Sequence, residues 1–124
     1  MIRKHPKYLS LLKIRLPLPG WVSILHRISG AMLFLFIPFL LWLLQESLGT
    51  AEAYAVFKSA LASPLVKFVL FGLVWAFLHH FFAGIRYLAL DMLLGIDLGP
   101  ARASSIAVLI ASSVLTLLIG VRLW

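Results

Sequence analysis

Cysteine is absent from this chain of 124 residues, and charged residues are scarce. Without cysteine the chain contains no disulfide bond, no thiolate metal site and no cysteine nucleophile. Charged residues make up 12% of the sequence, which is too few to solvate the surface of a soluble domain of this length. Hydrophobic residues make up 63%, and the mean hydropathy is +1.07. The composition therefore predicts an integral membrane protein.

Acidic residues are especially rare, because the chain has 4 of them against 11 lysines and arginines, for a formal net charge of +7. A basic protein that binds nucleic acid needs a solvated basic face, which such an apolar sequence does not offer. Here the cations lie beside apolar segments, where lipid headgroups and membrane topology explain them. The charged N-terminal segment lacks the apolar core of a signal peptide. We expect a multi-pass protein of the bacterial inner membrane that contacts lipid and no nucleic acid.

Three apolar segments are each long enough to cross a bilayer, which takes about 20 residues. We expect an all-α integral membrane chain that forms a single domain (1–124), with a basic arm at about 1–20. The expected spans are about 21–48, 64–90 and 104–124. Pro38 predicts a kink inside the first span, and Pro64 after Ser63 is typical of a helix start.

The two segments between the spans differ in character. Residues 50–62 place apolar side chains at helical spacing, which predicts a helix lying on the membrane surface. Residues 91–103 contain the pair Gly99-Pro100, so we expect a turn throughout this segment. Ser104 or Ser105 would then cap the third span.

Positive charge is concentrated on one side of the expected spans. Arg86 precedes the second linker and Arg102 lies within it, whereas the first linker has only Lys58 and Lys67 nearby. Because cytoplasmic segments of membrane proteins carry an excess of Lys and Arg, we expect the N-terminus and second linker in the cytoplasm and the C-terminus in the periplasm. The basic residues of the arm and the first span are Arg3, Lys4, Lys7, Lys13, Arg15 and Arg27.

A first polar cluster opens the first span, in the sequence Ser23-Ile24-Leu25-His26-Arg27-Ile28-Ser29-Gly30. Ser23 and Arg27 lie four residues apart and share a helical face, as do His26 and Gly30. Hydroxyl and guanidinium donors on one face are suited to binding a quinone carbonyl. Arg27 also fits a simpler role, in which its side chain reaches the headgroups and anchors the end of the span.

A second polar cluster interrupts the second span with consecutive histidines. One of them begins a stripe of residues at helical spacing that runs to the membrane surface: His80, Gly84, Tyr87 and Asp91. His80 lies about 16 Å from Asp91 along the helix axis and therefore deep in the hydrocarbon. Because the first span ascends and the second descends, both polar clusters are expected in the same leaflet.

An ionisable residue at this depth usually faces a protein interior, a cofactor or an ion path. Imidazole is a common ligand of haem iron, so His80 is a candidate haem ligand, with an interhelical hydrogen bond as the alternative. His79 is rotated by about 100° around the helix and cannot face the same iron. We expect His79 to pack against a neighbouring helix or a partner chain.

Other residues near the expected ligand are candidates for surrounding such a cofactor. Its propionates would extend toward His26, Arg27 or Arg86. In the simplest alternative, Arg86 forms an interfacial ion pair with Asp91 or with a partner chain. Gly84, one turn from the ligand, allows close helix packing, room for a flat macrocycle, or both.

The two clusters resemble the signatures of the cytochrome b membrane-anchor subunit of succinate dehydrogenase (respiratory complex II). The first signature is Ser, two residues, His-Arg, one residue, and Ser or Thr, met by Ser23, His26, Arg27 and Ser29. The second is His, three residues, Gly, an aliphatic residue, Arg-His and a later Asp, met by His80, Gly84, Ile85, Arg86 and Asp91 with Tyr87 replacing the second histidine. The upstream Arg-Pro of the family is His5-Pro6 here. The resemblance covers nearly the whole chain.

The resemblance implies that His80 is an axial ligand of haem b. A companion anchor subunit would supply the second axial histidine and complete the helical bundle. The resemblance also implies that His26 lies near the haem propionates and that Ser23 and Arg27 contribute to the ubiquinone site. A propionate contact from Tyr87 would use a phenol in place of the family's imidazole.

By the same resemblance, electrons from succinate reach ubiquinone through a flavoprotein subunit and an iron–sulfur subunit, which links the tricarboxylic acid cycle to electron transport. The chain itself has no flavin fold, no catalytic base and no iron–sulfur cysteines, so it would not oxidise succinate. Two alternatives stay open: a haem-less anchor of a fumarate reductase, and a small membrane subunit with a purely structural role.

Overall fold

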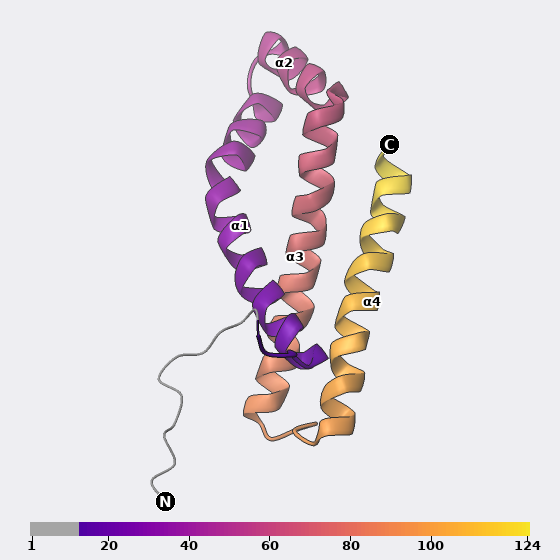
Figure 1. Ribbon diagram of the computed structural model, residues 1–124. Helices are drawn as coiled ribbons and strands as arrows, with labels where there is room; N and C mark the ends of the chain where they lie inside the picture. The colour runs from indigo at the N-terminus through magenta and orange to yellow at the C-terminus, as the bar shows by residue number, and fades with distance from the viewer. Residues whose placement is uncertain (1–12) are drawn as a thin grey trace, which may run out of the picture.

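The computed structural model describes residues 13–124, which form a bundle of helices without strands (Figure 1). The helices are α1 (Leu18–Leu48), α2 (Ala51–Ala62), α3 (Pro64–Asp91) and α4 (Leu98–Leu123). α1, α3 and α4 are each long and apolar enough to cross a membrane. The predicted all-α class with three spans is therefore confirmed. The residues of the basic arm before Lys13, including His5-Pro6, lie outside the described part of the chain.

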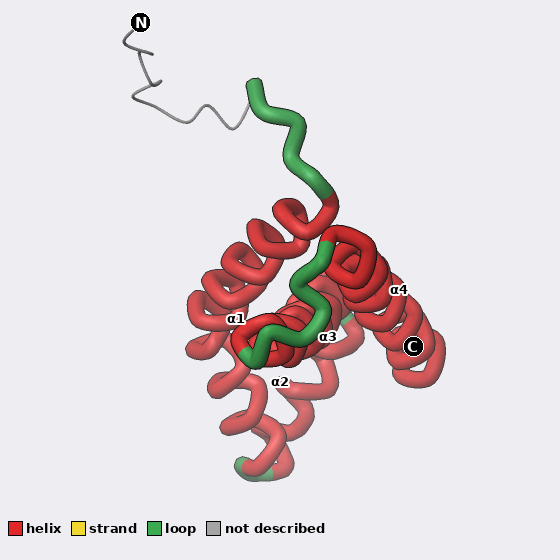
Figure 2. Tube along the Cα trace, turned by 90° about the horizontal axis from the view of Figure 1, so that it is seen from below, coloured by secondary structure: helices red, strands yellow, loops and turns green. Residues whose placement is uncertain are grey.

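α3 is the central helix of the bundle and packs against α1 on one side and α4 on the other (Figures 1 and 2). α1 begins, α3 ends and α4 begins at the same end of the bundle, while α2 joins α1 to α3 at the opposite end (Figure 1). A small core near the first of these ends contains one residue from each span: Val22, Ala83 and Val108. The two polar clusters of the sequence are therefore brought to the same end, as predicted.

Three hydroxyl side chains of α4 are almost completely buried in the bundle: Ser105, Ser112 and Thr116. Each donates a hydrogen bond of 2.7 Å to the carbonyl oxygen four residues before it, on its own helix. This bond satisfies the hydroxyl without water, so the small side chain can lie against a neighbouring helix.

Two predicted features of the helix starts and of the first linker are confirmed. Ser63 is the N-cap residue of α3 and Pro64 its first residue, although the Ser63 side chain makes no capping hydrogen bond. The predicted helix of the first linker is α2, whose start is capped by the Thr50 hydroxyl accepting from the Ala53 amide at 3.3 Å. Its place on the membrane surface stays a prediction. Pro38 lies within α1, which stays continuous to Leu48.

The predicted start of the third span was wrong. α4 begins at Leu98 after the N-cap residue Asp97, so the turn covers only residues 92–97. Pro100 is tolerated because the first backbone amides of a helix have no partner within the helix. Ser104 and Ser105 do not cap the helix, since both donate to the carbonyl oxygen of Ala101.

Candidate functional site

Two histidine side chains from different spans meet at the end of the bundle where α3 ends. The rings of His26 on α1 and His80 on α3 are stacked, with centroids 4.2 Å apart and planes within 8°. Both side chains are half-buried. The sequence had placed these residues in the same leaflet, and the structure brings them into direct contact.

The Nδ1 atom of His80 is held by α1. It lies 3.0 Å from the carbonyl oxygen of His26 and 3.4 Å from the Ser29 hydroxyl. Because a carbonyl oxygen only accepts hydrogen bonds, this contact assigns the proton to Nδ1. The Ser29 hydroxyl is already donated to the same carbonyl at 2.9 Å. The Nε2 atom of His80 is left with a lone pair, which is the form of imidazole that binds a metal ion.

Gly30 makes this close contact between α1 and α3 possible. A Cβ atom on Gly30 would lie 2.8 Å from Cε1 of His80, so any side chain there would displace the ring. Gly84 is different, because its Cβ would meet Nε2 of His26 at 3.8 Å, an ordinary contact. Sequence reasoning singled out Gly84 and overlooked the role of Gly30. The available signal was its position one turn beyond His26.

Tyr87 extends the histidine pair toward the end of α3. Its ring centroid lies 5.1 Å from that of His26. The Tyr87 hydroxyl is buried and has no hydrogen-bond partner among residues 13–124. A buried hydroxyl without a partner is costly, so this atom points to a polar group that the described chain does not itself provide.

Ser23 and Arg27 lie one turn apart near the start of α1, as their spacing predicted. Ser23 is half-buried and Arg27 is exposed. Neither side chain is engaged in a hydrogen bond within residues 13–124, so both donors are available to a ligand at the edge of the bundle.

Comparison with known proteins now adds to this geometry. The family model described as the succinate dehydrogenase/fumarate reductase transmembrane subunit matches residues 1–119. The chain belongs to this family. It is 35% identical over 125 residues to the succinate dehydrogenase cytochrome b556 subunit of Coxiella burnetii, covering 100% of both chains. It is 35% identical over 104 residues to the subunit of the same name from Paracoccus denitrificans, covering 84% of this chain and 80% of that one.

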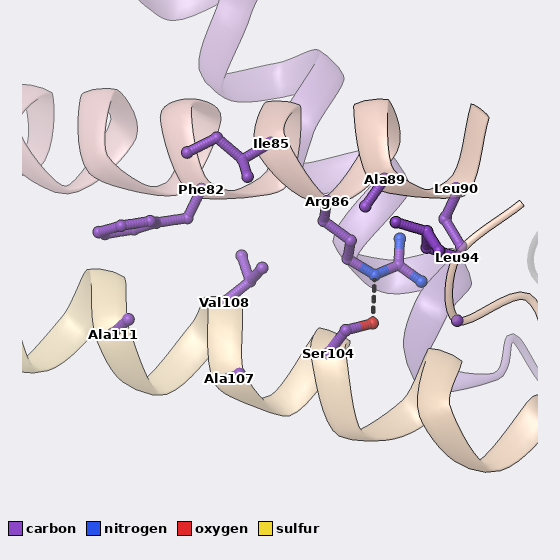
Figure 3. Close-up of a pocket in the computed structure, with 11 residues that line it drawn as sticks. Phe82, Ile85, Arg86, Ala89, Leu90, Leu94, Ser104, Ala107, Val108 and Ala111 are labelled. Carbon is purple, nitrogen blue, oxygen red and sulfur yellow. Dashed lines mark hydrogen bonds between the residues drawn. The ribbon is translucent and has the colours of Figure 1, made fainter. Parts of the chain in front are cut away.

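Arg86 of this transmembrane subunit is directed to α4 (Figure 3). Its Nε donates to the Ser104 hydroxyl at 2.9 Å and its Nη2 to the carbonyl oxygen of Ala101 at 3.4 Å. The predicted ion pair with Asp91 was therefore wrong. Asp91 is exposed, and two residues that lie five positions apart on a helix do not share a face. Contact of Arg86 with a haem propionate stays a prediction.

His79 of the transmembrane subunit is completely buried within the bundle. Its ring stacks on that of Trp75, with centroids 4.9 Å apart, and Trp75 Nε1 donates to the Ser113 hydroxyl of α4 at 3.3 Å. Neither ring nitrogen of His79 has a hydrogen-bond partner within residues 13–124. The consecutive histidines therefore have separate environments, since His80 contacts α1 and His79 lies in the interior.

Proposed function

We propose that the chain is the cytochrome b anchor subunit of a bacterial succinate dehydrogenase, which holds one side of a haem b and part of a quinone site. The single observation that carries the proposal is the state of His80. Its Nδ1 is bound to the His26 carbonyl oxygen at 3.0 Å, which leaves Nε2 as the free donor atom. The printed name of the relatives, cytochrome b556 subunit, supports haem b as the cofactor.

The residues around His80 fit such a group. A metal-binding histidine usually donates its other nitrogen to a carbonyl or carboxylate oxygen, which fixes the ring orientation and raises its basicity. The His26 carbonyl oxygen does this here, and the Ser29 hydroxyl lies beside it. Within residues 13–124, no three His, Cys, Asp or Glu side chains converge as a metal site. His80 would hold the haem iron from this chain, and a second anchor subunit would supply the other protein ligand.

Several side chains of this chain would surround the bound group. The buried Tyr87 hydroxyl, which lacks a partner in the described chain, is suited to donate a hydrogen bond to a propionate. The imidazole of His26 and the guanidinium of Arg27 are further donors near the same end of α1. When bound, the haem supplies one-electron transfer, while the protein sets its potential through ligands, hydrogen bonds and burial.

Ser23 and Arg27 would form this chain's part of the quinone site. Both lie near the membrane surface and present donors that are not engaged within the described chain. Donors fixed in position beside a quinone carbonyl stabilise the negative charge that develops there on reduction. Flavoprotein and iron–sulfur subunits would oxidise succinate and deliver the electrons to ubiquinone from the cytoplasmic side of the inner membrane, where the N-terminus of this chain would lie.

The proposal is tested by a reduced-minus-oxidised absorption spectrum of the complex purified through this chain. We expect the α and Soret bands of a low-spin b-type haem with two histidine ligands. A complex that contains its catalytic subunits but no such bands would overturn the haem assignment and favour the haem-less anchor of a fumarate reductase. A complex without catalytic subunits would favour a structural role.

Gly30→Ala provides a prediction that depends on the packing of α1 against His80. The added Cβ would lie 2.8 Å from Cε1 of His80, so the ring or α1 must move. Overpacking of this kind costs about 1–3 kcal/mol, and here it acts on the presumed ligand itself. We expect a shifted haem potential and a lower ratio of haem to protein, measured by redox titration and pyridine haemochrome assay. Gly72→Ala is the matched control: a Cβ atom at this position of α3 would meet nothing within 4 Å, so equal effects of both variants would contradict the prediction.

A further inference from the structure

Arg86 is a buried cation without an acidic partner in this chain. It is 7% exposed, and its hydrogen bonds go to two neutral oxygens, the Ser104 hydroxyl and the Ala101 carbonyl. Its Nη1 has no hydrogen bond within residues 13–124. Burying a charge is costly unless the charge is paired, so an anion is expected at this guanidinium.

The acidic residues of the chain do not supply that anion. There are only 4 of them, and all lie in the described part: Glu46, Glu52, Asp91 and Asp97. The two glutamates lie at the opposite end of the bundle, on α1 and α2. The two aspartates are exposed in or beside the turn of residues 92–97, and neither is bonded to Arg86. Stacking of the guanidinium on the Tyr87 ring, 5.4 Å away, adds no compensating charge.

A groove runs between α3 and α4, from Leu94 in the turn past Arg86 to Phe82 and Ala111 (Figure 3). The cavity has a volume of about 270 Å³, and Arg86 and Ser104 are the polar side chains of its lining. The apolar lining includes Phe82, Val108 and Ala111. Ser104 and Ala111 are seven residues apart, or about 10 Å along the helix axis. The lining also continues past Arg86 to Leu90 and Leu94, so the guanidinium lies inside the groove with apolar side chains on both sides of it (Figure 3).

We propose that this groove binds one anionic phospholipid, with the phosphate on the Arg86 guanidinium and an acyl chain along Phe82 and Val108. The charge and the shape point to the same class of ligand. A guanidinium binds phosphate oxygens with two parallel hydrogen bonds, and basic pockets between membrane helices are known lipid-headgroup sites. Ile85, at the mouth of the groove, is 50% exposed, as expected where the groove opens to the bilayer. A protein carboxylate would pair with Arg86 but would leave the apolar length of the groove unexplained.

The test measures binding of defined lipids to the assembled complex. The complex is purified with its partner subunits, delipidated, and titrated with phosphatidylglycerol or phosphatidylcholine of the same acyl chains, and bound lipid is counted by native mass spectrometry. We expect one phosphatidylglycerol to bind in preference to phosphatidylcholine. Arg86→Gln should weaken it about tenfold, as expected for a lost charge-assisted pair. Arg102→Gln, which removes an exposed charge from the first turns of α4, should not.

A second variant tests the apolar part of the groove without touching the cation. Ala107 is exposed and lines the groove, so Ala107→Phe fills it while the hydrogen bonds of Arg86 remain. It should also weaken phosphatidylglycerol binding, and it decides the question if Arg86→Gln fails to assemble. Unchanged affinity in Ala107→Phe, equal binding of the two lipids, or equal loss in both arginine variants would overturn the proposal. A changed haem spectrum or a lost subunit in Arg86→Gln, with lipid binding intact, would assign Arg86 to the haem or to a partner carboxylate instead.

Discussion

The His80→Ala variant is expected to assemble into its complex without b-type haem. The contact of the His80 Nδ1 with the His26 carbonyl oxygen at 3.0 Å fixes the ring and leaves its Nε2 available to bind a metal ion. Loss of a residue that merely orients a metal ligand costs about 10- to 100-fold in affinity, and loss of the ligand itself costs at least as much. The measurement is the amplitude of the reduced-minus-oxidised haem bands per assembled complex.

His79→Ala is the matched control for this experiment. It removes an adjacent imidazole of the same helix, but one that lies in the interior against Trp75. The cavity left behind should lower the midpoint of thermal unfolding by several degrees while the haem bands keep their position. Retention of haem in His80→Ala together with its loss in His79→Ala would exchange the roles of the two histidines and overturn the proposed site. Recovery of the bands in His80→Ala on adding free imidazole would show that only the ligand was missing.

The separate environments of these neighbours were predictable because helix geometry alone fixes their directions. Residues 79 and 80 differ by about 100° around α3, so one contact excludes the other. The same geometry placed His26 and His80 in one leaflet. It also argues against the predicted pair of Arg86 and Asp91, since only residues three or four apart are neighbours on a helix surface. That error came from judging charge by proximity in the sequence.

The contacts that could not be predicted from the sequence are those that depend on how closely two helices approach. The bond from His80 Nδ1 to a backbone carbonyl oxygen involves a group that every residue carries, so no residue type marks it. The role of Gly30 is equally tertiary, because it exists only where a ring of α3 lies against α1. The start of α4 was misplaced for a local reason. Gly99 and Pro100 usually interrupt helices, yet in a first turn the missing amide of proline costs no hydrogen bond.

Arg27→Ala is expected to slow quinone reduction by about 10- to 100-fold, as the loss of a charged hydrogen-bond donor to a developing anion predicts. Succinate oxidation with a soluble dye as electron acceptor should continue at the wild-type rate, because the flavoprotein does not depend on this side chain. Arg27 is exposed near the start of α1, and replacing an exposed side chain changes stability little, so the loss would not come from a folding defect. The measurement compares both activities in the same purified complex, together with its haem content.

Arg102→Ala distinguishes a specific donor from general positive charge at this end of the bundle. Arg102 is exposed in the first turns of α4, which begins at the same end of the bundle as α1 (Figure 1). If positive charge near the surface were enough, both variants would lose quinone reduction equally, and the role of Arg27 would reduce to anchoring the span. If Arg27→Ala lowered dye reduction as much as quinone reduction, the variant would have a defect in assembly of the complex. The two donors of α1 are placed beside the quinone oxygen if Arg27→Ala slows quinone reduction alone, Ser23→Ala slows it in part, and Arg102→Ala does not slow it.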